Sequence, residues 1–511
     1  MTRKKILNKH LVNNNLARKK GKNKDILKNG IEHGKKAKIK FMNTLGRKVE
    51  TFVPINKKEI KMYTCGPTVY NRAHIGNMRA YIFADIVRRT LKFGKYKVKQ
   101  VMNITDVGHL TSDADEGEDK LQKSAREQRT TAWEISRIYT SQFLDDASKL
   151  NIEPVEILCK ATDHISEQIK LIKRLEQKGF TYITSDGVYY DTSKFPRYGD
   201  LAKLDVEGLR AGKRIKIGEK RNKTDFALWK FSKPEEKRDM EWDSLWGKGF
   251  PGWHLECSAM SMKYLGETFD IHTGGIDHIP IHHTNEIAQS EGATGKKFVN
   301  YWLHSDFLVM NDREKMSKSL GNVITLETLQ KKGIDPLAYR YLCLGAHYRK
   351  RLLFGENILI KASNSLDRLK RKFLELKKNI GNVRLEEKKN KNVKKYLDQF
   401  LSNIFNDLNT PQALATMWKM LRDNKISNSD KYTLLLNFDN LFGLALDKIK
   451  PEKIEADNET YQLLKEREDA RKGKDWEKAD KLRDKIHDSG FIIEDTPEGP
   501  RLKRDNSYND K

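Results

Sequence analysis

Residues 59–105 read EIKMYTCGPTVYNRAHIGNMRAYIFADIVRRTLKFGKYKVKQVMNIT, and this stretch decides the fold. Its apolar pattern predicts a strand over 59–65, a helix over 77–93 and a second strand over 97–104. A strand–helix–strand unit is the start of a parallel α/β sheet. Ligands of such sheets bind at the carboxyl ends of the strands, so we expect functional side chains directly after these two strands.

Further along the chain, the sheet pattern is interrupted and then resumes. Residues 118–178 look helical, 181–191 alternate like a hairpin, and 194–233 are rich in turn and charged residues. Strand signals return at 269–272 and 299–308. We therefore predict a doubly wound domain that carries an insertion. The carboxyl ends of its strands would hold four residues: Cys65, Thr105, His272 and Met310.

The second half of the chain is helical in pattern. Helical periodicity runs from Asp335 to about residue 450, and the final block shows two helices followed by a short strand at 491–494. The predicted division is an arm at 1–38, a catalytic-type α/β domain at 39–345 with its insertion at about 118–250, a helical bundle at 346–455 and a small C-terminal domain at 456–511.

Net charge points to a polyanionic partner. The chain has 98 Lys and Arg against 71 Asp and Glu, a formal charge of +27. Residues 1–40 hold 14 basic and 2 acidic side chains, and residues 349–400 hold 16 and 6. Nucleic acid is the first candidate partner, and a solvated basic surface is the alternative. Residues 451–511 carry 14 basic and 17 acidic groups, so an RNA contact there would need specific groups.

The four cysteines at 65, 159, 257 and 343 are too sparse for a disulfide framework. A reduced, cytoplasmic setting fits this spacing. No window approaches the roughly 20 apolar residues of a membrane span, so no membrane partner is expected. The N-terminus lacks the apolar run of a secretory signal, although its basic, acid-poor composition leaves a mitochondrial presequence as an alternative.

Two short motifs are of the kind that contacts a polyphosphate. His74-Ile75-Gly76-Asn77 opens the first predicted helix, where imidazole, amide and free backbone N–H groups can face phosphates. Taken alone, the motif is more typical of a turn histidine that caps a helix. Lys315-Met316-Ser317-Lys318-Ser319 puts two lysines in a Ser/Gly-rich loop. Lysines placed there can neutralise charge that develops as pyrophosphate leaves, and a solvated basic loop is the alternative.

A scattered set of residues could bind a metal ion. Cys65 ends the first strand, Cys257 lies in Trp253-His254-Leu255-Glu256-Cys257, and His282 precedes Glu286 by four positions. On an α-helix His282 and Glu286 share a face, whereas His283 would point about 100° away. Two thiolates, an imidazole and a carboxylate suit tetrahedral zinc. Inert buried thiols and a core histidine are the alternative interpretation.

Together these motifs resemble the class I aminoacyl-tRNA synthetases, and more closely the cysteinyl family. The resemblance rests on HIGN and KMSKS and on several longer stretches: Tyr63–Tyr70 (YTCGPTVY), Asn103–Asp106 (NITD), Pro251–Ser258 (PGWHLECS) and His282–Gln289. It covers about nine tenths of the chain. The tail around Asp475-Trp476-Glu477 is similar to that family's small anticodon-reading domain.

The resemblance implies roles for particular residues. It implies one zinc ion per chain on Cys65, Cys257, His282 and Glu286. The cysteine and ATP pocket that it implies is lined by Thr105, Trp253, His272, Gly274, Gly275 and Asp277, with Asp277 as partner of the substrate ammonium group. Catalytic roles fall to Lys318 as the phosphate-binding lysine and to Lys315, His74 and Asn77. Cys159 and Cys343 match no functional position.

Three departures from the family pattern stand out. Asn77 replaces a histidine and keeps a donor that does not titrate. Thr284 replaces a frequent Glu without touching an implied ligand. Val107-Gly108-His109 replaces a more acidic segment, and His278 lies near the implied metal. His109 or His278 as an additional ligand therefore remains open.

The resemblance implies a cysteine–tRNA ligase. Such an enzyme activates L-cysteine with Mg·ATP and transfers it to the 3′ end of tRNA(Cys), here as an expected monomer. Two alternatives remain: an enzyme that joins activated cysteine to a small amine, which the long helical half disfavours, and a non-enzymatic RNA-binding protein on a decayed fold, which the intact motifs disfavour.

Overall fold

The structure is a computed structural model of the chain. It describes residues 38–109, 118–204, 219–233, 235, 238–310, 323–379, 391–450, 456–496 and 499–504. The predicted basic arm and the lysine motif with Lys315 and Lys318 lie outside the described residues.

Five parallel strands form the central sheet, in the order β11-β10-β3-β4-β5. The strands are β3 (Ile60–Thr64), β4 (Val98–Ile104), β5 (Ile157–Lys160), β10 (Phe269–Gly275) and β11 (Val299–Ser305). In the central register, Met62 of β3 lies opposite Gln100 of β4 and Ile271 of β10. The predicted strand–helix–strand unit is confirmed as β3, α3 (Ile75–Phe93) and β4.

The sheet separates two hydrophobic cores because successive side chains of a strand point to opposite faces. Ile60 and Met62 join the core that contains α3 and the helical bundle. Tyr63 and Cys65 join the core on the other face, which α8 (Trp253–Leu265), α9 (Thr284–Thr294) and α6 (Ile165–Gln177) help to form. Helix α3 is buried nearly all round, as expected for a helix between a sheet and a bundle.

Several strands were not anticipated. Edge strand β5 lies in the stretch 118–178, which was predicted to be helical; four residues are too few to show a strand period. The predicted strand at 299–308 is divided into β11 and β12 (Leu308–Met310), and β12 pairs with β13 (Leu352–Phe354), so Met310 lies off the central sheet. Strand β15 (Gly499–Arg504) pairs antiparallel with β14 (Phe491–Thr496).

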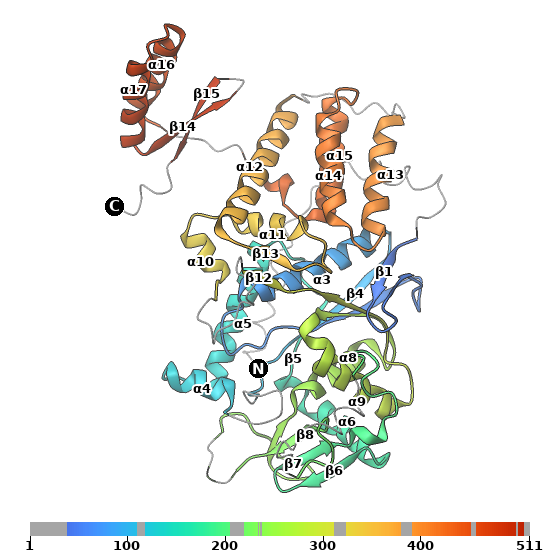
Figure 1. The fold of residues 1–511 in the computed structure, drawn as a ribbon. Coiled ribbons are helices and arrows are strands. Elements are labelled where there is room, and N and C mark those ends of the chain that lie inside the picture. The colour runs from blue at the N-terminus through green and yellow to red at the C-terminus, as the bar shows by residue number, and fades with distance from the viewer. Residues whose placement is uncertain are drawn as a thin grey trace, which may run out of the picture.

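The chain between β4 and β10 supplies helices and a second sheet. Helices α4 (Lys120–Glu127) and α5 (Ala132–Lys149) precede β5. Four antiparallel strands then form the second sheet: β6 (Thr181–Thr184), β7 (Gly187–Tyr190), β8 (Phe226–Phe231) and β9 (Gly249–Pro251). β6 and β7 confirm the predicted hairpin. Figure 1 shows this sheet on the side of the central sheet away from the bundle.

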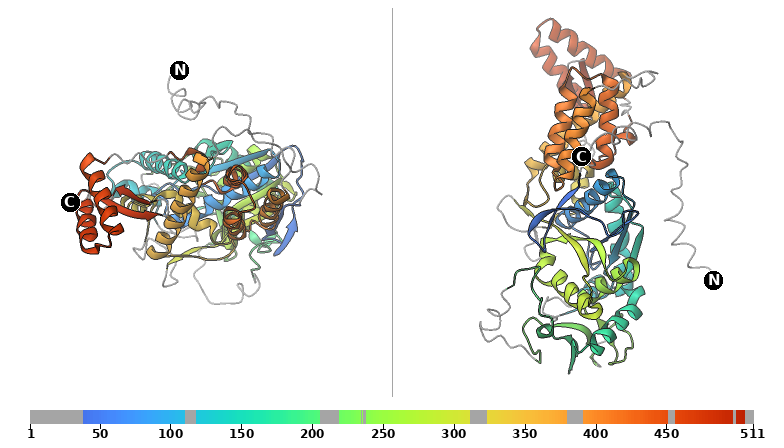
Figure 2. Two further views of the ribbon diagram at one scale, coloured as in Figure 1. Left: turned by 90° about the horizontal axis from the view of Figure 1, so that it is seen from above. Right: turned by 90° about the vertical axis from the view of Figure 1, so that its right-hand side faces the viewer.

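The helical half follows as predicted. After β12 the helices are α10 (Leu326–Lys331), α11 (Pro336–Leu344), α12 (Glu356–Asn379), α13 (Lys391–Phe405), α14 (Thr410–Arg422), α15 (Asn428–Phe442), α16 (Asn458–Lys472) and α17 (Trp476–Asp488). Helices α12–α15 stand as a bundle above α3, and α16, α17, β14 and β15 form a separate small unit (Figures 1 and 2). None of the described helices has a stretch apolar and long enough to span a lipid bilayer.

Candidate functional site

Four buried side chains from distant parts of the chain meet near the carboxyl end of β3. They are Cys65, Cys257, His282 and Glu286, and their ligand atoms all lie within 4.8 Å of one another. The Sγ of Cys65 is 3.9 Å from the Sγ of Cys257 and 3.8 Å from Oε1 of Glu286. The Nε2 of His282 is 3.0 Å from the same Oε1. The four residues predicted as metal ligands therefore share one buried space.

Local structure explains how these residues converge. Cys65 follows β3, and Cys257 lies on α8, which packs on that face of the sheet. His282 lies in a π-helical turn, Ile279–His283, that leads into α9 and Glu286. This turn makes the prediction for His283 wrong: a π-turn advances each residue by less than an α-helix does, and the Nε2 of His283 also faces the cluster, 3.3 Å from the Sγ of Cys65.

A second set of possible ligands overlaps the first. Cys65 and Glu286 are shared, and His272 and His283 replace Cys257 and His282. Glu286 joins the two sets because its Oε2 lies 2.9 Å from Nε2 of His272 while its Oε1 contacts His282. His272, predicted for the cysteine pocket, therefore lies directly beside the candidate metal ligands.

The electrostatics favour charged donors. Burial raises the pKa of Glu286, but His272 and His282 outweigh it and hold that pKa well below its usual range. Burial also raises the pKa of Cys257, yet the Cys65 thiol and His282 lower it to about 7 overall. Burial, then Cys257, raise the pKa of Cys65. The site thus holds one carboxylate and one thiol of lowered pKa, both buried.

Residues around the cluster orient the ligands. The Nδ1 of His282 lies 2.9 Å from Nδ1 of His254, which leaves its Nε2 toward Cys257 and Glu286. Neighbours of this kind fix the ring orientation of metal-binding histidines. Among the described residues, Nδ1 of His272 is buried without a hydrogen-bond partner. The donor set fits a zinc site, and the unsatisfied imidazole nitrogen beside it fits a further polar group.

A line of imidazoles runs from the cluster toward an N-terminal hairpin, in which β1 (Lys40–Asn43) pairs antiparallel with β2 (Lys48–Thr51). Nδ1 of His283 lies 2.7 Å from Nε2 of His304, and Nδ1 of His304 lies 2.6 Å from Oγ1 of Thr44. Sequence reasoning missed His254, His283 and His304. His254 lies inside the quoted PGWHLECS stretch and could have been singled out, whereas His304 carries no local signal.

Two residues predicted for the cysteine pocket lie near the carboxyl end of the sheet, and one of them contacts the cluster. Trp253 begins α8, and its ring centroid lies 4.7 Å from that of His282. Thr105 follows β4 and is held against the segment after Cys65, because its N–H donates to the carbonyl of Pro67 at 3.0 Å. Both therefore lie at the same edge of the sheet.

The end of β10 carries the other predicted pocket residues. A Cβ on Gly274 would lie 2.7 Å from Nδ1 of His278 and 2.7 Å from Cε1 of His283, so the close approach of two imidazoles requires glycine. Gly275 ends the strand, and Asp277 follows in an exposed turn. Asp277 is thus open to a charged partner.

The two extra histidines occupy different positions. Nε2 of His109 lies 2.6 Å from Oε1 of Glu256, the residue before Cys257. His278 lies against Gly274 and His282. Neither belongs to the two ligand groups found among the described residues.

The predicted phosphate motif forms the N-terminus of α3. His74 is the N-cap: its Nδ1 accepts from the N–H of Asn77 at 3.1 Å, and Oδ1 of Asn77 accepts from the N–H of His74 at 3.2 Å. This reciprocal pair is a capping box. The N–H of Ile75 donates to the carbonyl of Ile324 at 2.9 Å, so the start of α3 pairs with the chain that precedes α10.

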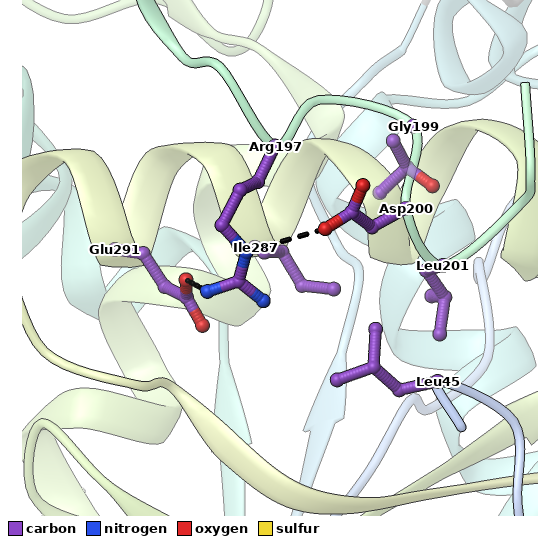
Figure 3. A pocket seen from close by; sticks show the side chains of 8 residues that line it. Leu45, Arg197, Gly199, Asp200, Leu201, Ile287 and Glu291 are labelled. Carbon is purple, nitrogen blue, oxygen red and sulfur yellow. Dashed lines mark hydrogen bonds and ion pairs between the residues drawn. The ribbon is translucent and has the colours of Figure 1, made fainter. Parts of the chain in front are cut away.

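A small hollow lies beside α9, and contacts among the residues that line it hold the helix in place. Arg197 lies between Asp200 and Glu291 there, at 3.2 and 3.3 Å (Figure 3). The hollow is about 10 Å³, close to the lower limit for one water molecule. Thr284 also lines it, and its hydroxyl donates to the carbonyl of Ile279 at 2.7 Å, which ties the π-turn to α9.

Comparisons with known proteins agree with this architecture. Residues 51–364 match the class I (C) tRNA synthetase catalytic domain, and residues 455–499 match the cysteinyl-tRNA ligase anticodon binding domain. The cysteine–tRNA ligase 1 of Burkholderia lata is 49% identical over 91% of this chain and 96% of its own length. The cysteine–tRNA ligase of Treponema denticola is 47% identical over 89% and 98%.

Among solved structures, the fold is similar to a Mycobacterium tuberculosis methionyl-tRNA synthetase in complex with methionyl-adenylate. That similarity has a TM-score of 0.51 at 13% identity and covers 76% of this chain and 90% of that one. On the sequence matches, the chain belongs to the cysteine–tRNA ligases, a family of class I aminoacyl-tRNA synthetases.

Proposed function

We propose that this enzyme recognises L-cysteine through one zinc ion held by Cys65, Cys257, His282 and Glu286. The observation that carries the proposal is that these four donors are buried within 4.8 Å of one another. Zinc bound there would supply a Lewis acid that takes the substrate sulfur as thiolate. A serine hydroxyl is a poorer ligand, so selection can exceed the roughly 1–3 kcal/mol that a methylene difference provides.

The surrounding residues position the rest of the amino acid. Trp253 and Thr105 border the cluster and would enclose the short side chain. Asp277 is exposed beside it and would pair with the substrate ammonium group. His272, Gly274 and Gly275 would form the floor along β10, where glycine leaves space for close backbone approach. These groups orient the substrate carboxylate toward ATP.

Activation then needs orientation and charge stabilisation. The carboxylate of cysteine attacks the α-phosphate of Mg·ATP and pyrophosphate leaves; a terminal ribose hydroxyl of tRNA next attacks the acyl carbon and AMP leaves. We assign the phosphate contacts to His74 and Asn77 at the N-terminus of α3, where the positive end of the helix dipole favours anions. Lys315 and Lys318 would neutralise the charge of the departing pyrophosphate.

The C-terminal unit would contact the anticodon of tRNA(Cys). Its similarity to an anticodon binding domain supports this assignment. Trp476 is 60% exposed at the start of α17 and Tyr461 is 47% exposed on α16. Exposed aromatic rings stack on unpaired bases. We accordingly assign residues 39–345 to catalysis, 346–455 to the tRNA stem and 456–511 to the anticodon.

The proposed zinc site also bears on the setting of the enzyme. All four cysteines are free and buried. Two of them must remain reduced to bind zinc, which fits the reducing cytoplasm. We propose a cytoplasmic monomer.

The test is pyrophosphate–ATP exchange with purified enzyme. We expect exchange with cysteine and not with serine, one zinc per chain by elemental analysis, loss of exchange after chelation and recovery on adding zinc. Full activity of a zinc-free preparation would contradict the zinc proposal. Equal exchange with serine would contradict the proposed basis of selectivity.

A further inference from the structure

The loop between Cys65 and His74 is fastened by a single arginine that contacts two carboxylates. Arg72 donates from Nε and Nη2 to Asp146 of α5, at 3.1 and 2.7 Å. Its Nη1 donates to Glu327 of α10 at 2.5 Å. The side chain is 16% exposed and that of Asp146 is fully buried. A bidentate contact of this kind fixes the guanidinium plane as well as its charge.

One of the two carboxylates, Glu327, belongs to a helix whose start is paired with the phosphate motif. Glu327 lies in the first turn of α10, two residues after its N-cap Thr325. The backbone of Thr325 pairs with that of His74, and the carbonyl of Ile324 accepts from Ile75. Arg72 therefore lies two residues from His74 and also holds the helix whose start is paired with His74.

Arg72 forms ion pairs that connect the loop with α5 and α10. Asp146 raises the pKa of Arg72, which keeps its charge fixed. Loss of the guanidinium would leave the buried Asp146 carboxylate unpaired. It would also remove the side-chain contacts of this loop with both helices, so that the backbone pairing of His74 with Thr325 would hold α10 without them. Binding groups displaced by about 1 Å can cost about 100-fold in rate.

We propose that Arg72 is a positioning residue for ATP: through Asp146 and Glu327 it sets the place of His74 and the N-terminus of α3 relative to the nucleotide phosphates. The inference rests on the proposed phosphate contacts of His74 and Asn77. It assigns no contact between Arg72 and a substrate. Its consequence is specific, because the ATP end of the site should change while the zinc end does not.

The test is Arg72→Gln, with two readouts that do not depend on each other. Calorimetry with ATP alone should show about 10- to 100-fold weaker binding, and pyrophosphate–ATP exchange should show a raised KM for ATP. Zinc content and the KM for cysteine should stay at wild-type values. Arg72→Lys keeps one charge and can contact one carboxylate, so it should fall between wild type and Arg72→Gln.

Two further variants separate positioning from stability. Glu327→Gln, at a side chain that is 46% exposed, should fold normally and weaken ATP binding in the same direction by a smaller factor. Lys331→Gln removes the other cation on Glu327, which is 3.2 Å away and 76% exposed, and should change nothing.

Unchanged ATP affinity in Arg72→Gln and Glu327→Gln would overturn the inference. The inference would also be overturned if Arg72→Gln lowered kcat and zinc content together and left the KM for ATP unchanged. That is the result expected if Arg72 had a merely structural role. If wild-type enzyme bound ATP but failed to activate cysteine, the proposed function would fail while the ATP affinities still tested Arg72.

Discussion

At the residue scale, Glu286 carries most of the organisation of the candidate zinc site. Its two oxygens contact His272 and His282, and both sets of possible ligands include it. The ligands come from positions as far apart as 65 and 286, so no spacing rule could assemble them. The residue types offered the set only beside the alternative of inert thiols and a core histidine, and the resemblance to a family favoured it; the structure shows that the four donors are close and buried.

Replacing Cys257 by serine should disable zinc binding and cysteine binding together. A hydroxyl is a weaker zinc ligand than a thiolate, and the thiol of Cys257 is the one whose pKa is lowered, to about 7. We expect zinc to fall well below one per chain and the KM for cysteine to rise at least about 10-fold. Cys343→Ser is the matched control, since that thiol is buried in the other core. Normal zinc content in Cys257→Ser would refute the assignment.

Gly274→Ala should damage the pocket without removing a ligand. The added methyl group would lie 2.7 Å from each of two imidazoles, those of His278 and His283. His283 would have to move from Cys65. We expect a higher KM for cysteine with little change in the KM for ATP, measured by exchange kinetics. Gly473→Ala, where the added atom would meet its nearest neighbours at an ordinary 3.5 Å, controls for the loss of a glycine. An unchanged KM for cysteine would show that the imidazoles can give way.

The direction of the His283 side chain could not be predicted from the sequence, because it depends on the local backbone geometry. The spacing of His282 and Glu286 correctly indicated a shared face, but the rule that placed His283 elsewhere assumed an α-helix. A π-turn between Ile279 and His283 broke that assumption. Such turns occur at functional sites and have no composition of their own.

At the element scale, α3, α5, α11 and α15 are joined by one buried arginine. Arg340 donates to Asp85 at 2.5 Å and to the carbonyls of Phe442 at 2.6 Å and Leu150 at 3.0 Å. Both charged side chains are fully buried. The buried guanidinium is tolerated because each of its three nitrogens donates to an acceptor.

Arg340→Met should destabilise the protein by about 3 kcal/mol, because it leaves a buried carboxylate with only one cation. Burial raises the pKa of Asp85, but Arg340 and then Arg89 outweigh it and lower that pKa. The stabilisation is therefore present at neutral pH and is lost as pH falls through the lowered pKa. The difference in Tm from wild type should be largest near pH 7 and shrink in acid. Arg351→Met, at an exposed position, is the control, and an equal shift there would contradict the argument.

The elements themselves were predictable where they are long or patterned. The β3–α3–β4 unit shows both periods clearly, and α12–α15 show continuous helical spacing. Strand β5 was missed because Ile157–Lys160 follows a long helix and has only four residues. Its place is fixed by pairing with β4, which is a tertiary cause that local sequence does not contain.

At the scale of the whole molecule, the C-terminal unit should be separable from the chemistry. All candidate zinc, cysteine and ATP residues precede position 321. Removing 456–511 should leave exchange close to wild type and sharply reduce charging of tRNA. A small-amine ligase would keep its full turnover after that cut. Unimpaired charging by the truncated enzyme would contradict the anticodon assignment.

The basic arm at 1–37 lies outside the described residues, and its composition alone supports a prediction. Its positive charge should add sequence-independent affinity for tRNA by displacing counterions. Deleting the arm should flatten the dependence of tRNA binding on salt and leave exchange unchanged. Loss of exchange on deletion would show that the arm belongs to the catalytic fold.

Helix α3 connects the proposed ATP site with the helical bundle. His74 caps its first turn, and Arg89 near its last turn donates to the carbonyl of Asn440 in the bundle at 2.9 Å. Nineteen residues make a rod of about 28 Å. If the bundle tilts α3 by about 2°, the N-terminus of the helix moves by about 1 Å. A displacement of that size is enough to make or break a phosphate contact.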